Sequence, residues 1–75
     1  MKDIKDIIEA KRVQEAYNKL KEKLTTREKD VLVRYYGIGK QVRHSLYDIG
    51  ARYNVTRERI RQIKAEALRK LKIKK

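Results

Sequence analysis

The sequence contains no cysteine and no proline, and it has only three glycines. Without cysteine there can be no disulfide framework and no thiolate metal site, which suits a reducing cytoplasm. Glycine and runs of β-branched residues are too scarce for strands, so an all-α fold is expected. Neither a phosphate-binding glycine loop nor a metal-ligand cluster is visible, and we predict no metal and no cofactor.

Long apolar runs are absent as well. No stretch approaches the ~18 residues that a membrane span requires. Charged residues follow Met1 where a signal peptide would have an apolar run. We therefore expect a cytoplasmic protein without a membrane partner. The length of 75 residues allows one small domain with a thin core.

Charge is abundant and uneven. The chain has 22 basic and 10 acidic residues, a formal net charge of +12. Residues 56–75 hold nine basic and two acidic residues, so +7 of the +12 lies in that segment. Such a distribution favours an anionic partner, with nucleic acid first and anionic lipid or acidic protein behind it.

The N-terminal segment has the spacing of an amphipathic helix, which we expect from about Lys2 to Lys23. Apolar residues recur mostly three or four positions apart, at Ile4, Ile7, Ile8, Val13, Tyr17, Leu20 and Leu24. The register of this apolar stripe slips between Ile8 and Val13. We predict an N-terminal helix within residues 1–24 and a DNA-binding core at residues 25–75, together one domain.

Capping signals divide the core into helices. Thr25 and Glu28 have the spacing of a capping box, and Gly37 is a natural stop for the helix that follows. Residues Ile38 to His44 are expected to form a polar, basic loop. A weaker capping box at Ser45–Asp48 begins a third helix. The second helix should bury Val31, Leu32, Tyr35 and Tyr36, and the third Leu46, Ile49 and Tyr53.

The segment from Ser45 to Leu71 has the pattern of a helix-turn-helix motif. Asn54 tolerates the positive φ that a tight turn demands, and Thr56 can cap the helix after it. Gly50 lacks a Cβ, which would let that last helix approach closely. The fold class is therefore a small all-α helix-turn-helix domain of four to five helices, similar to a winged helix without its wing.

The last helix has two contrasting faces. At about 100° per residue, one arc of about 140° collects Arg57, Glu58, Arg61, Gln62, Ala65 and Arg69. The opposite side collects Ile60, Ile63, Ala67 and Leu71. We predict that the apolar side packs inward and the polar side faces outward. A merely solvated basic helix is the plain alternative, but the turn before Thr56 and the choice of Arg, Glu and Gln favour DNA recognition.

These residues resemble region four, the C-terminal domain, of primary bacterial sigma factors. The most diagnostic match is VTRERIRQI at residues 55–63, preceded by SLYDIG at residues 45–50. The upstream half also fits, at Leu24, Thr25, Arg27, Glu28, Val31, Leu32, Tyr36, Gly37 and Ile38. The resemblance covers residues 24–71. The first helix resembles the family only in being a helix, without matching motifs.

The resemblance implies a role in transcription initiation, in which the domain holds RNA polymerase at promoters by recognising the −35 element in the major groove. It implies base contacts from Arg57, Glu58, Arg61 and Gln62. Arg suits guanine, Glu suits the cytosine amino group, and Gln can contact adenine, which agrees with these roles independently. Contacts to the DNA backbone would come from Arg27, the Leu46 N–H, Thr56 and Arg59.

The resemblance also implies protein partners. The family binds a helix of the β-subunit flap of core RNA polymerase through an apolar patch, for which Tyr36, Ile38 and Leu71 are the candidates by position. These three side chains could equally be plain core. Anti-sigma factors and transcription activators are further partners that the resemblance suggests.

Four positions depart from the family pattern. Tyr35 stands where an arginine commonly contacts phosphate, and Tyr47 replaces an acidic residue. Lys64 and Glu66 swap the charges of a surface that some activators touch.

Three other classes of protein were weighed. A stand-alone helix-turn-helix regulator, from a phage or mobile element, would use the same DNA face without polymerase and could dimerise through the first helix. A basic helix for membranes or acidic proteins is disfavoured, because the last helix has no aromatic residue on its apolar side. An enzyme is least favoured: His44 and Ser45 are adjacent, but no carboxylate is evident to orient them, and we predict no catalytic residue.

Overall fold

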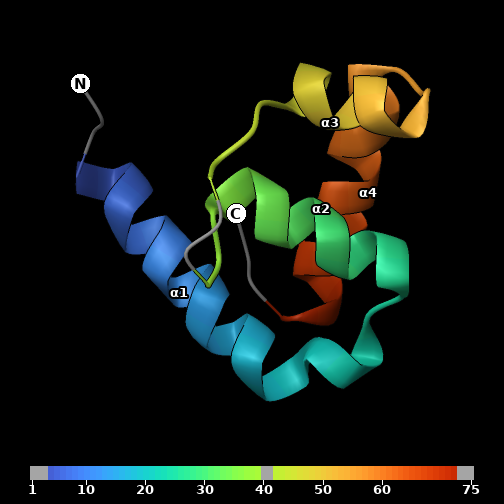
Figure 1. Ribbon diagram of the computed structural model, residues 1–75. Coiled ribbons are helices and arrows are strands. Elements are labelled where there is room, and N and C mark those ends of the chain that lie inside the picture. The colour runs from blue at the N-terminus through green and yellow to red at the C-terminus, as the bar shows by residue number, and fades with distance from the viewer. Residues whose placement is uncertain (1–3, 40–41, 73–75) are drawn as a thin grey trace.

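The computed structural model describes residues 4–39 and 42–72, and within the first turn of the first helix it describes the backbone alone. These residues form four α-helices and one 3₁₀ turn, and no strand occurs among them: α1 (Ile4–Leu20), η1 (Lys21–Lys23), α2 (Thr26–Tyr36), α3 (Leu46–Tyr53) and α4 (Arg57–Lys70). In Figure 1, α3 packs on α4 at one end of the molecule, and α1 runs along the other. The predicted all-α helix-turn-helix class is confirmed.

The first helix differs from the prediction in its end and in its buried face. The α-helix ends at Leu20 and a 3₁₀ turn continues to Lys23. Val13 is fully buried, whereas Ile8 is 53% exposed and does not join the apolar stripe. The cause is the register slip, because five residues at 100° each place these two side chains about 140° apart. Lys2 and the side chains of Ile4 and Ile7 lie outside the described residues.

Helix α2 begins and ends as its sequence predicts. The Thr25 N–H donates to the Glu28 carboxylate at 2.9 Å, and the Glu28 N–H donates to the Thr25 hydroxyl at 3.1 Å. This reciprocal capping box satisfies two amides that the helix itself cannot. Gly37 takes a left-handed φ of 68° at the other end. Val31 and Leu32 are fully buried between the two ends.

The loop after α2 is less polar than expected, because Ile38 is only 6% exposed and belongs to the core. Its N–H donates to the Val33 carbonyl oxygen at 3.1 Å. This is the bond of a Schellman motif, in which the residue after the left-handed glycine folds back on the helix and makes an apolar contact with it. The far end of the loop is fastened by the His44 N–H, which donates to the Arg34 carbonyl at 2.8 Å.

The turn between α3 and α4 has the geometry that the sequence predicted. Ser45 and Asp48 form the capping box of α3, and Asn54 takes a left-handed φ of 60°. The Val55 N–H donates to the Gly50 carbonyl at 2.8 Å. A Cβ on Gly50 would lie 2.7 Å from the Val55 carbonyl oxygen, so no larger residue fits without displacing the backbone. The short α3 can therefore fold tightly back on the start of α4.

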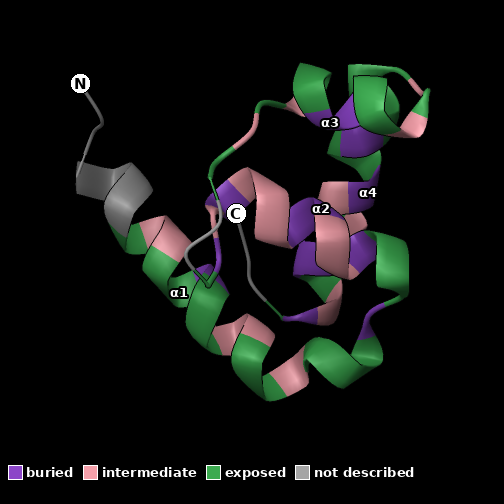
Figure 2. Ribbon diagram, in the orientation of Figure 1, coloured by how far each residue is buried: buried purple, intermediate pink, exposed green. Residues whose placement is uncertain are grey.

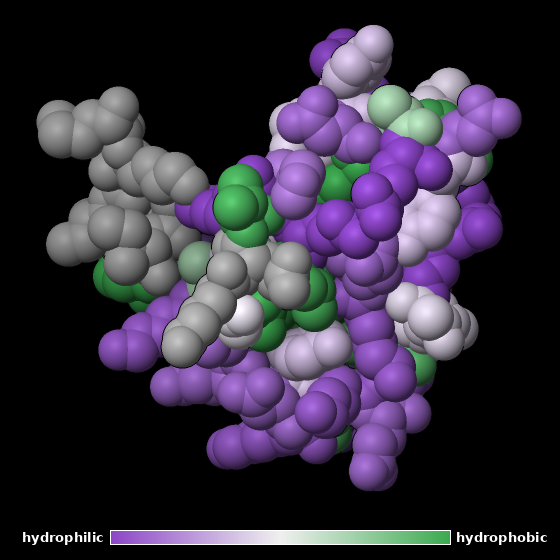
Figure 3. Space-filling view, viewed as in Figure 1, coloured by the Kyte–Doolittle hydropathy of each residue, from purple (hydrophilic) through white to green (hydrophobic). Residues whose placement is uncertain are grey.

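Two apolar clusters hold the helices together, and α4 contributes to both. The first, which we call the motif cluster, joins α2, α3 and α4 through Val31, Ile49, Ile60 and Ile63. The second, the α1 cluster, joins α1, α2 and the end of α4 through Val13, Leu24, Leu32, Tyr36, Ile38, Ala67, Leu68 and Leu71. Leu68 was not among the predicted inward residues. Figure 2 shows buried positions on α2, α3 and α4, while the described part of α1 is mainly exposed or intermediate. Most of the coloured surface in Figure 3 is hydrophilic.

Two polar contacts tie α2 to α3 and α4. The Lys70 ammonium donates to the Glu28 carboxylate at 2.9 Å, which joins the start of α2 to the end of α4. The Tyr53 hydroxyl donates to Asp30, which also accepts two bonds from Arg34. Burial alone would raise the pKa of each carboxyl group. The hydrogen bonds and the cations beside them outweigh burial, so the pKa values of Glu28 and Asp30 lie below the ordinary range.

No helix in the described part of the chain combines the length and apolar character needed to cross a membrane.

Substituting Ile60 by alanine should destabilise the fold, because its side chain is fully buried in the motif cluster. The expected loss is ~2–5 kcal/mol in the free energy of unfolding, a large part of the stability of a small domain. Chemical denaturation of Ile60→Ala beside Arg57→Ala, which alters an exposed side chain of the same helix, measures this loss. Equal losses from both variants would show that α4 is rotated from the orientation described.

Stability should fall in acid because of Glu28. Its pKa in the folded chain lies below the ordinary value of 4.5. The carboxylate therefore stabilises the fold above about pH 4.5, and this contribution is lost as the pH falls through the lower folded value. Melting temperatures at pH 7 and pH 3 should differ less in Glu28→Gln than in the parent chain. Glu22→Gln, at an exposed position in η1, should behave like the parent. An undiminished acid effect in Glu28→Gln would contradict this role.

Candidate nucleic-acid interface

Helix α4 presents its polar face to solvent. The Thr56 hydroxyl accepts the Arg59 N–H at 3.1 Å and so caps the start of the helix. Ile60, Ile63 and Ala67 are buried on the inner face. The predicted outward residues are all exposed: Arg57, Glu58, Arg61, Gln62, Ala65 and Arg69. The four candidates for base contacts, Arg57, Glu58, Arg61 and Gln62, therefore share one accessible surface, which we call the recognition face.

Two of these candidates are paired with each other in the free chain. The Arg61 guanidinium donates to both oxygens of Glu58, at 3.0 and 2.5 Å. This bond lowers the pKa of Glu58 and raises that of Arg61. Both side chains are 58% exposed, so the pair adds little to stability. Both groups stay charged at neutral pH, and either can exchange its partner for a base edge.

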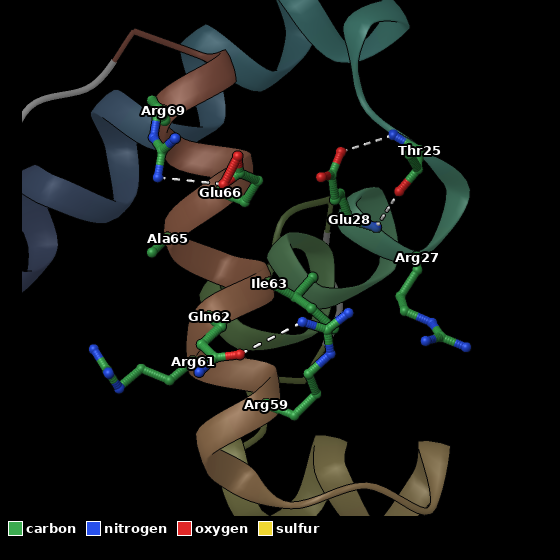
Figure 4. Close-up of a pocket in the computed structure, with 10 residues that line it drawn as sticks. All are labelled: Thr25, Arg27, Glu28, Arg59, Arg61, Gln62, Ile63, Ala65, Glu66 and Arg69. Atoms are coloured by element: carbon green, nitrogen blue, oxygen red, sulfur yellow. Dashed lines mark hydrogen bonds and ion pairs between the residues drawn. The ribbon is translucent and has the colours of Figure 1, made fainter.

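A cleft of about 540 Å³ lies between the start of α2 and the outer side of α4. Figure 4 shows Arg27 on the α2 wall and Arg59 reaching along α4 toward Gln62, while Arg61 extends from the side of α4 that is away from Arg27. The two acidic residues of its lining are both paired, Glu28 with Lys70 and Glu66 with Arg69. The cleft thus offers a cationic surface beside the recognition face.

The candidates for backbone contacts lie on both sides of α4. Arg27 and Arg59 line the cleft just described, and the Arg27 guanidinium lies 5.1 Å from the centre of the Tyr53 ring. Leu46 lines a second cleft, of about 430 Å³, on the other side. Thr56 sits at the start of α4 as its cap. The candidate residues therefore flank α4 from two clefts.

The second cleft contains a residue whose position the sequence did not reveal. Its lining consists of Tyr35, Ser45, Leu46, Tyr47, Arg57, Glu58 and Arg61. Tyr47 is 70% exposed and comes from the first turn of α3. The sequence marked it only as a departure from the family pattern, because its proximity to the recognition face depends on how α3 packs against α4.

The other aromatic departure, Tyr35, is not free to replace an arginine at a phosphate. Its ring packs edge-on against Tyr36, with 4.9 Å between the ring centres. The Lys64 ammonium lies 4.5 Å from the centre of the Tyr35 ring. The positive charge beside position 35 is therefore that of Lys64 of α4, which lies over the Tyr35 ring. Lys64 is itself a departure from the family pattern.

The three candidates for polymerase contact lie together, but in the core. Tyr36, Ile38 and Leu71 are 7%, 6% and 3% exposed, and all belong to the α1 cluster with Val13. The Tyr36 hydroxyl donates to Glu9 of α1 at 3.0 Å. Burial and this bond to a carboxylate raise the pKa of Tyr36. In the free chain these residues are therefore packed beneath α1 and do not form an open patch.

Of the two residues considered for catalysis, Ser45 serves as a helix cap. The Ser45 hydroxyl accepts the Asp48 N–H at 3.0 Å, which is the capping role that the sequence predicted. Within residues 4–39 and 42–72, no group of His, Cys, Asp and Glu side chains is arranged to hold a metal ion.

A tight turn between two helices, the second with an exposed face of Arg, Glu and Gln, defines a helix-turn-helix DNA-binding protein. Comparison with known proteins specifies the family. Residues 22–72 match the family described as sigma-70, region 4, and the chain belongs to it.

Two similar proteins are RNA polymerase sigma factors. The chain is 48% identical over 58 residues to the RNA polymerase sigma factor RpoD of Neisseria gonorrhoeae, covering 77% of this chain and 9% of that protein. It is 48% identical over 60 residues to the RNA polymerase sigma factor SigA of a Nostoc species, covering 80% of this chain and 15% of that protein. The chain thus spans a small part of the length of these relatives.

Glu58 and Arg27 should affect DNA binding in different ways. Glu58→Ala should relax the preference at one base pair, at a cost of ~1–3 kcal/mol for the preferred sequence. Arg27→Ala should weaken binding to all sequences alike and lower the salt dependence by about one counterion. Fluorescence anisotropy titrations against single-base variants of a selected site, at several salt concentrations, separate the two effects. An unchanged base preference in Glu58→Ala would argue against direct recognition at that position.

Proposed function

We propose that this chain is a promoter-recognition module of a sigma factor, which binds the −35 element through α4 and so contributes to transcription initiation. The observation that carries the proposal is the exposed row of Arg57, Glu58, Arg61 and Gln62 on α4, immediately after the turn of the motif. Membership of the sigma-70 region 4 family supports it.

Base recognition would follow from the chemistry of these four side chains. An arginine can donate two bonds to guanine O6 and N7, and a glutamate can accept from the cytosine amino group. Glu58 and Arg61 now satisfy each other, so each would exchange one strong partner for another on binding. A site without a matching base would leave one of the charges without a partner, and this loss is a source of specificity.

Backbone contacts would fix the register of α4 in the groove. The Thr56 hydroxyl accepts the Arg59 N–H and still has its own hydrogen to donate to a phosphate. The Leu46 N–H is the first amide of α3, where no acceptor exists within the helix. Arg27 and Arg59 supply charge from the larger cleft. These groups carry no sequence information, but they orient the groups that do.

The partner protein would be core RNA polymerase, whose β-subunit flap helix we propose to bind at the α1 cluster. Tyr36, Ile38 and Leu71 are packed there with Val13 of α1. A flap helix that reached these three side chains would have to take the place of α1, and the Tyr36–Glu9 hydrogen bond would break. Anti-sigma factors or activators remain further proposed partners, for the surfaces around α4.

One experiment tests this function as a whole. Sequences bound by the chain are selected from random DNA, and core polymerase is captured on the immobilised chain in parallel. A site similar to TTGACA together with polymerase capture is the expected result. Binding by the isolated chain should be weak and strongly salt-dependent, because polymerase would supply a high effective concentration at a promoter.

A contrasting result would favour the free-standing regulator. Tight, salt-tolerant binding of a dimer to a palindromic site, without capture of polymerase, would contradict the sigma-factor role while leaving the DNA face in place.

A further inference from the structure

Tyr47 is an exposed aromatic residue at the edge of the recognition face. Among the described residues only Ile8, Val42 and Tyr47 are large apolar side chains that are clearly exposed. Of these three, Tyr47 is the one that lines a cleft with Arg57 and Arg61. No hydrophobic cluster includes its ring. The ring therefore adds little to the apolar core, and it is accessible to a ligand.

The charges around Tyr47 favour an anion. Arg57 and Arg61 line the same cleft, and Glu58 is held by Arg61 through two hydrogen bonds. Asp48, the acidic residue next in sequence, is engaged in the capping box of α3. The lining around the Tyr47 ring therefore holds two arginines and one carboxylate, so its net charge is positive.

The position of the cleft matches the path of a DNA strand. Arg27 and Arg59 line the larger cleft on one side of α4, and Tyr47 lines the smaller cleft on the other. A helix that lies in the major groove has a sugar-phosphate strand on each side, and the first helix of a helix-turn-helix crosses one of them. Because Tyr47 belongs to the first turn of that helix, it faces the backbone rather than the floor of the groove.

We propose that Tyr47 is a DNA-backbone contact in which the ring packs on a deoxyribose and the hydroxyl donates to the adjoining phosphate oxygen. This inference rests on the proposed DNA-binding function and extends it by one residue and one strand. Tyrosine hydroxyls are established donors to phosphate. A neutral amphipathic ring also suits a surface that is apolar at the sugar and polar at the phosphate, where a carboxylate would be repelled.

The test compares Tyr47→Phe, which removes only the hydroxyl, with Tyr47→Ala, which removes the ring as well. Binding to the selected site and to a scrambled site is measured by fluorescence anisotropy. Tyr47→Phe should weaken both by about threefold, as expected for one hydrogen bond. Tyr47→Ala should weaken both by about tenfold, with the added loss of apolar contact. The ratio between the two sites should not change in either variant.

A chemically modified probe locates the contact. Single methylphosphonate groups, which lack the charged oxygen, are placed along each strand of the selected site. At one position, the methylphosphonate should weaken DNA binding by the parent chain more than binding by Tyr47→Phe, because that variant has already lost the hydrogen bond to the phosphate. Ile8→Ala is the matched control, since it removes an exposed apolar side chain of α1 and should bind every probe as the parent does. Melting temperatures confirm that each variant is folded.

The outcomes separate the inference from the function on which it rests. Parental affinity of Tyr47→Ala for both sites, with the parent still preferring its selected site, would overturn the Tyr47 contact alone. A change of preferred sequence in Tyr47→Ala would also overturn it, in favour of a base contact. A parent chain without any DNA binding would overturn the proposed function, and the inference with it.

Discussion

The burial of Ile60 and Ile63 against Val31 and Ile49 determines how α4 is rotated about its own axis. A helix has one orientation in which a given pair of apolar side chains faces the core, and every other side chain of the helix follows from it. Arg57, Glu58, Arg61 and Gln62 are exposed together because these two isoleucines are buried. The recognition face is thus a consequence of the packing, and no polar contact is required to create it.

The position of α4 relative to α3 depends on a different constraint, which is the absence of a side chain at Gly50. The Val55 carbonyl oxygen occupies the place that a Cβ would need, and the left-handed Asn54 reverses the chain between the two helices. Two long-range contacts then join these helices to α2. Tyr53 of α3 donates to Asp30, and Lys70 of α4 donates to Glu28. Packing in the motif cluster sets the rotation of α4, and these two contacts add to the apolar packing that holds α3 and α4 on α2.

Features governed by neighbouring residues could be predicted from the sequence. The capping boxes at Thr25 and Ser45, the left-handed Gly37 and Asn54, and the two faces of α4 depend on spacings of a few residues. The exposure of Ile8 could have been predicted in the same way, because the slip toward Val13 was visible in the spacing. The burial of Ile38 follows from the Schellman motif after Gly37, whereas the sequence alone left open whether Ile38 was core or a polymerase contact.

Features that join distant parts of the chain could not be predicted. Lys70 and Glu28 are 42 residues apart, and Tyr53 and Asp30 are 23 apart. Nothing in the local pattern of either residue selects its partner. For the same reason, the sequence identified Tyr47 only as a departure from the family pattern. Its place beside Arg57 arises from the fold of α3 onto α4, and its exposure there depends on the whole motif.

The excess positive charge and the recognition face would contribute differently to DNA binding, the first to attraction and the second to sequence discrimination. A net charge of +12 on 75 residues attracts any nucleic acid, so it cannot by itself distinguish one sequence from another. Discrimination requires groups that lose a partner at the wrong site. In the proposed complex the Glu58–Arg61 pair would have this property, because its two charges are satisfied in the free chain and would need equal partners on DNA. Bound nonspecifically, the pair can stay closed while the remaining cations contact phosphates. At a matching site, the proposed base contacts would open the pair by replacing what each residue gives up, so the pair would help to separate attraction from recognition.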